Sequence, residues 1–364
     1  MDEETLPKVN DNTDINDIRI SSQFKGYTFS KFKKTEVVKQ YLDNLKKGRI
    51  EPACYWSAEL ICSGHLMDVW ETIILYVSKY IHLGNPKIIR YIENRYDIFR
   101  NIMAKGQYIN ELQLRNHPTI RTLFAEINGI ICNSNKKNSF EAIKINKEEE
   151  FDITNMADIL IAPNLSYIED ILKQDDPKEL CIATNEFAYN ISADKRNMVN
   201  ACYWIEWMTE FQAICKKRKK PCKCESRNYP VEAKFRNDII WIIWEIMFSY
   251  ADKKNAYCST LIHSLFSIFC IKYTTASSRK RRYLLYFAVS LITEDIPTNI
   301  ELITNKPIIE TITKKINTIY KQIKKNEESP NTEYLFANLE NENTFEQSMR
   351  KMEMVNSMDF LTRK

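Results

Sequence analysis

Three cysteines lie close together in a stretch of sequence that is otherwise strongly basic. They are Cys215, Cys222 and Cys224. Thiolates are good zinc ligands, and neighbouring lysines or arginines lower the pKa of a thiol. A structural zinc ion takes four ligands, so a fourth would have to come from elsewhere, for example from Cys258 or His263. The spacing permits a structural zinc site and equally fits ordinary reduced thiols on a basic loop. No other cofactor is indicated.

The same stretch concentrates positive charge, and a second basic cluster follows later in the chain. Lysines and arginines neutralise phosphates and release counterions, so two such clusters on one face would bind nucleic acid or another polyanion. Tyr229 and Tyr283 lie beside the clusters and could stack on exposed bases. Nuclear targeting signals and solvated loops have the same composition. The candidate residues are Lys216, Lys217, Arg218, Lys219, Lys220, Lys223, Arg227, Arg279, Lys280, Arg281 and Arg282.

The sequence contains no motif of a known catalytic site. The six glycines are placed so that neither a phosphate-binding P-loop nor a dinucleotide-binding G-x-G-x-x-G can form. The four histidines form no zinc-protease pair, and no G-x-S-x-G turn occurs. Four glutamates on otherwise apolar segments fit partly exposed helix faces or buried ion pairs better than paired functional carboxylates. They are Glu59, Glu71, Glu206 and Glu245. We therefore expect a protein that is not an enzyme.

The scarcity of glycine also bears on the fold class. None occurs after Gly129, whereas tight β-hairpin turns usually need one. Helix start and stop signals are frequent instead, and the clearest start is Asp176 followed by Pro177. We expect an all-α fold of about 11–13 helices without a substantial sheet. The predicted helices are 36–46, 52–64, 67–82, 86–104, 118–132, 177–191, 195–215, 237–251, 256–272, 279–293 and 307–325.

A four-residue sequence, Ala-Cys-Tyr-Trp, occurs twice. It spans residues 53–56 and 201–204, and each copy leads into a mostly apolar segment that contains a glutamate. A similar segment precedes each copy, and another apolar helix is predicted after it. The pattern favours a duplicated helical hairpin. In this interpretation Tyr55, Trp56, Tyr203 and Trp204 form the packing core of the repeat.

The distribution of polar and apolar residues divides the chain into four parts. Residues 1–22 are predicted to be a disordered arm, residues 23–145 a first helical unit, and residues 146–325 a second unit with the related hairpin. Residues 326–364 are predicted to be a flexible linker that ends in a short amphipathic helix at 343–360. Methionines in this helix suit docking onto a partner or back onto the chain itself.

Compartment and partners follow from the remaining composition. Ten cysteines and an acidic N-terminus without an apolar segment predict a reducing compartment. Apolar stretches such as 239–250 are shorter than the roughly 20 residues that cross a bilayer, so we expect no membrane contact. A net charge of +4 does not by itself imply nucleic-acid binding. Protein partners are expected, and nucleic acid and further copies of the chain are open alternatives.

Two segments carry a resemblance to known sequences. Residues 52–65 and 76–86 resemble an uncharacterised α-helical protein family of nucleocytoplasmic large DNA viruses, of the mimivirus and phycodnavirus kind. The likeness extends over most of residues 20–325. It implies a viral protein of the host cytoplasm, in the viral factory, or of the virion or host nucleus. It implies no particular activity.

A second, local resemblance is to the C-terminal oligomerisation domain of RarA/MgsA-type ATPases, which are relatives of clamp loaders. It covers residues 40–145 and includes the loop 136–139. The matching residues are Ala53, Tyr55, Trp56, Gly64, Ser78, Asn85 and Pro86. The ATPase module is absent, so the resemblance implies a collar-like assembly role without ATP-driven work. We expect a non-enzymatic viral scaffold or adaptor, accessory to DNA replication, repair or transcription. The alternative is a virion-associated structural protein of the minor capsid or core.

Overall fold

The computed structural model describes residues 13–106, 108, 110–146, 150–151, 159–220, 222–328 and 349. Every regular element in these ranges is a helix, which confirms the predicted all-α fold. The α-helices are α1 (Lys34–Lys46), α2 (Ile50–Cys62), α3 (Leu66–Tyr76), α4 (Lys87–Lys105), α5 (Pro118–Asn133), α7 (Cys181–Ile191), α8 (Met198–Lys217), α9 (Ile240–Lys254), α10 (Ala256–Phe269), α11 (Thr275–Lys280), α12 (Arg282–Thr293) and α13 (Lys306–Lys324). Shorter helices are η1 (Ser21–Phe24), η2 (Val77–Ile81), η3 (His82–Gly84), η4 (Glu111–Asn116), η6 (Ser166–Ile168), η7 (Lys178–Leu180) and η8 (Ala233–Phe235).

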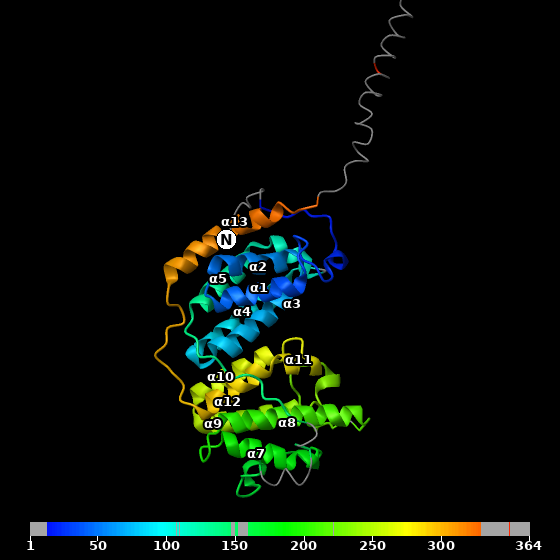
Figure 1. The fold of residues 1–364 in the computed structure, drawn as a ribbon, viewed down its shortest axis with the longest axis vertical. Coiled ribbons are helices and arrows are strands. Elements are labelled where there is room, and N and C mark those ends of the chain that lie inside the picture. Colours follow the sequence, from blue (N-terminus) through cyan, green and yellow to red (C-terminus); the bar gives the residue numbers. More distant parts are fainter. Residues whose placement is uncertain are drawn as a thin grey trace, which may run out of the picture.

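The helices form two stacked groups (Figure 1). Helices α1 to α5 make the first group, in which α1 packs against α2 and α2 against α5. Helices α7 to α12 make the second group, in which α7 packs against α8 and α9 against α10. Among the described residues no helix is long and apolar enough to cross a membrane.

Helix α13 does not belong to the second group, where residues 307–325 were predicted. It returns to the first group and packs on α2 and α5 (Figure 1). Gly129 of α5 allows the close approach, because a Cβ atom there would lie 3.2 Å from the Cγ1 atom of Ile309. The predicted boundary of the second unit is therefore wrong. The physical reason is that α13 carries a stripe of apolar side chains, which is buried against the first group. These residues are Ile309, Ile316, Ile319, Tyr320 and Ile323.

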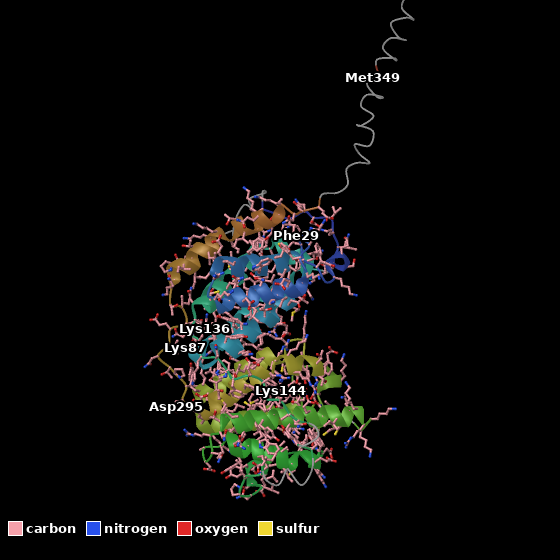
Figure 2. The ribbon with its side chains drawn as sticks, in the orientation of Figure 1. Phe29, Lys87, Lys136, Lys144, Asp295 and Met349 are labelled. Atoms are coloured by element: carbon pink, nitrogen blue, oxygen red, sulfur yellow. The ribbon has the colours of Figure 1, made fainter. Side chains whose placement is uncertain are left out.

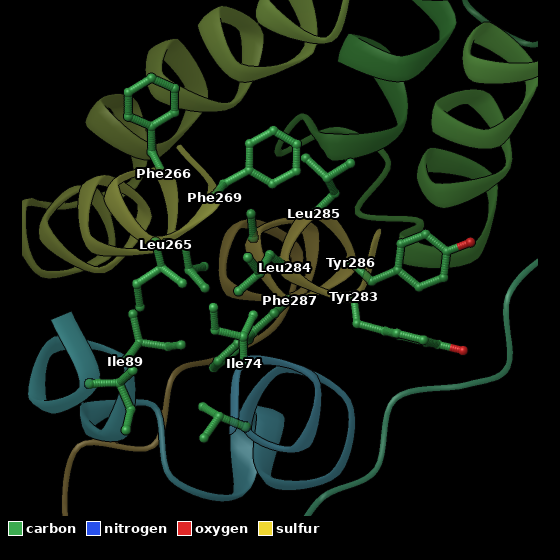
Figure 3. Close-up of a cluster of buried hydrophobic side chains, with 14 of the residues drawn as sticks. Ile74, Ile89, Leu265, Phe266, Phe269, Tyr283, Leu284, Leu285, Tyr286 and Phe287 are labelled. Atoms are coloured by element: carbon green, nitrogen blue, oxygen red, sulfur yellow. The ribbon is translucent and has the colours of Figure 1, made fainter. Parts of the chain in front are cut away.

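The two groups share one continuous core (Figure 3). On the second-group side of the junction lie Leu284 and Phe287 of α12 and Leu265 of α10, and on the first-group side lie Ile74 of α3 and Ile89 of α4. Helices α10 and α4 also pack against each other there. The groups are therefore halves of one folded body, since burying this junction removes large apolar side chains from water.

A strap of irregular chain, residues 134–146, ties the halves together on the outside. The amide of Ser139 donates a hydrogen bond to the carbonyl oxygen of Lys79 at 2.7 Å in the first half. The ring of Phe140 stacks on that of Tyr286 in the second half, with 5.1 Å between ring centroids. In Figure 2 the label of Lys136, near the start of this strap, lies beside the first group of helices, and that of Lys144, near its end, lies over the second group. The strap thus bridges the junction from outside the core.

The end of the α3 segment has an unusual backbone beneath this strap. Helix η2 is a π-helix, and the next residue, His82, has a φ of 47°. Its ring is 3% exposed and stacks on Phe287 at 4.7 Å. A Cβ atom at Gly84 would lie 2.6 Å from the carbonyl oxygen of Asn135, so only glycine lets the strap pass this closely.

The predicted disordered arm, residues 1–22, is partly ordered. Residues 1–12 lie outside the described residues, but Ile15 is buried in the same apolar cluster as the isoleucines of α13. The Arg19 guanidinium contacts the Asp17 carboxylate at 2.6 Å, and both residues are buried. The prediction of disorder for residues 13–22 is wrong because the charged side chains of Asp17 and Arg19 pair with each other where this segment packs on the protein. The predicted helix at 343–360 lies outside the described residues, apart from position 349.

Candidate polyanion-binding surface

The basic stretch begins in the last turn of α8 and continues into the loop that follows. Lys219 has a φ of 58°. Its amide donates to the Lys216 carbonyl oxygen at 3.2 Å, and the Lys220 amide donates to the Cys215 carbonyl oxygen at 3.1 Å. This pair of bonds is the Schellman arrangement, which caps the last carbonyls of a helix and reverses the chain. The backbone that carries these lysines therefore forms a compact turn at the C-terminal end of α8.

Six cations at this end of α8 are exposed, and together we name them the α8 cation cluster. They are Lys216, Lys217, Arg218, Lys219, Lys220 and Lys223. Within the described residues, no carboxylate lies within salt-bridge distance of any of them. The negative end of the helix dipole attracts the first two. The remaining charge is not compensated by direct ion pairs in the described part of the chain, although Glu179 lies near Cys215 and Cys222.

The second predicted cluster is only partly available. Arg281 is 2% exposed and donates to Glu71 and to two backbone carbonyl oxygens. Arg282 lies 3.2 Å from Glu206. These two arginines stabilise the fold and were wrongly predicted to form part of a binding surface. Arg279 and Lys280 are exposed.

Arg279 links the two basic clusters. Its guanidinium lies 3.5 Å from the carboxylate of Glu210, which is on α8. Glu210 precedes Lys217 by seven residues, about 10 Å along the helix. The exposed end of α11 therefore lies beside the last two turns of α8, near the α8 cation cluster.

Arg227 was also predicted to bind a polyanion, but it is 1% exposed. Its guanidinium donates to Asp176 Oδ2 at 2.6 Å and to Glu245 Oε2 at 2.7 Å. The carboxylate of Asp176 is therefore the ion-pair partner of Arg227 and does not cap the helix predicted at 177–191. The reason is that a buried guanidinium needs carboxylate partners more than a helix end needs a cap.

The two tyrosines proposed for base stacking are already packed. Tyr229 lies 5.3 Å from Trp241 and 4.7 Å from Phe266 between ring centroids. Tyr283 is buried, and the Lys79 ammonium lies 4.7 Å over its ring. Neither ring is free to stack on a base.

Two of the three cysteines of the loop lie near each other, since Cys215 is close enough to Cys222 to raise the pKa of its thiol. Cys224 is buried and its thiol donates to the carbonyl oxygen of Asp238 at 3.1 Å. Burial raises the pKa of Cys215 above its ordinary value and that of Cys222 and Cys224 to about 12. We expected the flanking cations to lower these pKa values, and that expectation is wrong because desolvation dominates. In the described residues no group of three or more His, Cys, Asp or Glu side chains is placed to hold a metal ion.

The repeated Ala-Cys-Tyr-Trp sequence lies on the second helix of two packed pairs, α1 with α2 and α7 with α8. Tyr55 and Trp56 make an edge contact at 5.2 Å, and Tyr203 and Trp204 make the same contact at 5.2 Å. Trp204 is buried, whereas Trp56 is half-buried beside Phe32. The four aromatic residues are structural in both places.

Sequence reasoning missed a cavity of about 870 Å³ near the N-terminal end of α8. Arg196, Lys253 and Lys254 are among its lining residues. These come from segments about 60 residues apart, so no local motif could have brought them together.

Comparisons with known proteins add no assignment. No protein-family model, curated protein or solved structure matches this chain.

Proposed function

We propose that this protein is a non-enzymatic helical scaffold that holds a nucleic acid by its phosphate backbone at the C-terminal end of α8. The observation that carries the proposal is the α8 cation cluster, in which six exposed cations have no ion-pair partner among the described residues. Elsewhere in the same unit Arg227, Arg281 and Arg282 each contact a carboxylate. An uncompensated run of this size attracts a polyanion.

The geometry favours phosphate contacts over contacts with bases. Lysine ammonium groups neutralise phosphates at many geometries, whereas base recognition needs stacking platforms or fixed hydrogen-bond donors. Tyr229 and Tyr283 pack inside the protein and offer no such platform. We therefore expect binding that does not depend on the nucleotide sequence and that includes duplex DNA.

The interpretation as a scaffold rests on how the buried carboxylates are used. Glu59 accepts hydrogen bonds from the amide and hydroxyl of Ser30 at 2.5 and 2.9 Å. Glu206 accepts a hydrogen bond from the hydroxyl of Tyr286 at 2.8 Å. Both carboxylates hold neighbouring segments in place, which is a structural use.

The test is a fluorescence anisotropy titration of a labelled DNA duplex at low salt. The first variant combines Lys216→Gln, Lys217→Gln and Lys219→Gln. We expect it to bind at least about tenfold more weakly than the wild type, because three phosphate contacts are lost.

A matched control removes the same charge from another surface. It combines Lys314→Gln, Lys315→Gln and Lys321→Gln, all exposed on α13. Because these residues are far from α8 in the fold, we expect less than about a twofold change in affinity (Figure 1). Equal weakening in both triple variants would show a general charge effect, and the proposed site would be abandoned. Absence of binding by the wild type at low salt would refute the proposed function.

A further inference from the structure

The cavity near the N-terminal end of α8 is a separate feature from the α8 cation cluster. Helix α8 has 20 residues and is therefore about 30 Å long, which separates the two. The cavity lies between the turn after η6, the connection from α7 to α8, and the second half of α9. Its volume of about 870 Å³ falls in the range of small-molecule sites, about 300–1,000 Å³.

Hydrogen bonds and ring contacts join the walls of this cavity. The Tyr250 hydroxyl donates to the carbonyl oxygen of Tyr167 at 3.0 Å, which connects α9 to η6. The Tyr167 hydroxyl donates to Asp194 at 3.3 Å, and its ring meets that of Tyr189 at 5.0 Å. Because each wall contacts another wall directly, the cavity is formed before any ligand arrives.

Cations gather on one side of the cavity. Arg196 and Lys253 are exposed, and neither has a carboxylate within salt-bridge distance among the residues that the structure describes. Lys254 is half-buried and donates to two backbone carbonyl oxygens at the end of α12, so one of its three N–H groups is left. Arg196 lies close enough to Lys254 to disfavour its charged form.

Of the three carboxylates in the described lining, Glu245 is held in ion pairs, while Asp194 and Asp170 are not. Glu245 contacts Arg227 at 2.7 Å and Lys173 at 3.7 Å. Asp194 accepts the hydroxyl of Tyr167, which leaves it able to accept a further hydrogen bond. Asp170 is exposed on the lining. The cavity therefore offers uncompensated cations together with two acceptors for hydroxyl groups.

We propose that this cavity binds a small phosphomonoester that also carries hydroxyl groups. The phosphate is held by Arg196 and Lys253, with Lys254 behind them, and the hydroxyls donate to Asp194 and Asp170. A phosphate fits because it is close to dianionic near neutral pH and has three oxygens for several donors, and arginine holds two of them with its planar fork. This site is independent of the nucleic-acid surface proposed above.

The experiment is isothermal titration calorimetry with glycerol 3-phosphate as the probe. We expect saturable binding at one site in the wild-type protein. Lys253→Gln and Arg196→Gly should each weaken binding at least about tenfold, since each removes a charged donor to the phosphate. Arg196 has a φ of 47°, which glycine adopts without strain, so Arg196→Gly should melt at or above the wild-type temperature. A loss of binding in that variant cannot come from unfolding.

The matched control is Lys195→Gln, which removes an exposed charge next to Arg196 from a residue that does not line the cavity. Its affinity should stay within about twofold of the wild type. The proposal is overturned if the wild type shows no saturable binding up to about 10 mM glycerol 3-phosphate. It is also overturned if Lys195→Gln weakens binding as much as the lining variants do, or if unphosphorylated glycerol binds equally well.

Discussion

His82 makes the stability of this protein depend on pH. His82 is 3% exposed, and among the described residues neither ring nitrogen makes a hydrogen bond of good geometry, although the nearby backbone of Tyr286 acts to raise its pKa. Burial lowers the pKa of His82 from 6.5 to about 4, and the nearby charge of Lys137 acts in the same direction. The folded protein therefore holds the neutral ring, while the unfolded chain takes up a proton near pH 6.5.

The sign and size of the effect follow from this difference. The stabilising contribution is complete above pH 6.5, falls as the pH drops below that value, and is lost as the pH passes through about 4. The free energy of unfolding should fall by about 2 kcal/mol between pH 7 and pH 5 from this group, and by about 3 kcal/mol by pH 4.

The assay is urea denaturation at pH 7 and pH 5 for the wild type, His82→Phe and His263→Phe. A phenylalanine ring at position 82 keeps the stacking on Phe287 and cannot be protonated. His263 is the matched control, since it also stacks on a phenylalanine, Phe248, but is exposed. His117, whose pKa burial also lowers, is present in all three proteins and cancels.

His82→Phe should lose about 2 kcal/mol less stability on acidification than the wild type, and His263→Phe should behave as the wild type does. If His82→Phe and the wild type lose the same stability between pH 7 and pH 5, the account of this residue is wrong.

Three further substitutions test the packing by urea denaturation. Arg227→Met should lower the free energy of unfolding by about 3–5 kcal/mol, because it leaves the buried Asp176 carboxylate without its cation. A loss below about 1 kcal/mol would mean that the pair is not buried as described. Gly84→Ala should cost about 1–3 kcal/mol, since its Cβ atom would lie 2.6 Å from the Asn135 carbonyl oxygen, and an unchanged stability would contradict the close approach of the strap. Lys219→Gly should raise stability by about 1 kcal/mol by relieving a φ of 58°, and a destabilised variant would contradict the Schellman turn.

Much of the fold could be predicted from the sequence because the signals are local. The absence of glycine after Gly129, together with proline and capping residues, indicated helices, and helices α1, α5 and α13 begin and end within two residues of the prediction. The placement of α13 could not be predicted in this way. Its stripe of isoleucines shows that one face is buried, but the partner face, which includes Gly129, is far away in the sequence.

The candidate site was predicted only in part, for the same reason. A run of lysines shows that positive charge is concentrated, but not which cations are paired. Arg227 and Arg281 have carboxylate partners that are 51 and 210 residues away, so their burial could not be inferred from neighbouring residues. The spacing of the three cysteines in the sequence likewise did not show how their thiols are arranged in space. Pairing across long sequence distances decides which charges remain available for function.

The central claim is that the α8 cation cluster binds a phosphate backbone, and the salt dependence of DNA binding tests it most directly. Binding constants of the wild type and of the Lys216→Gln, Lys217→Gln, Lys219→Gln variant should be measured between about 50 and 200 mM salt. For six cations, the slope of log K against log salt should be no steeper than about −5 in the wild type. In the variant the slope should be shallower, that is, less negative by about 3. A slope that is the same in both proteins, or a wild-type slope near zero, would contradict the account.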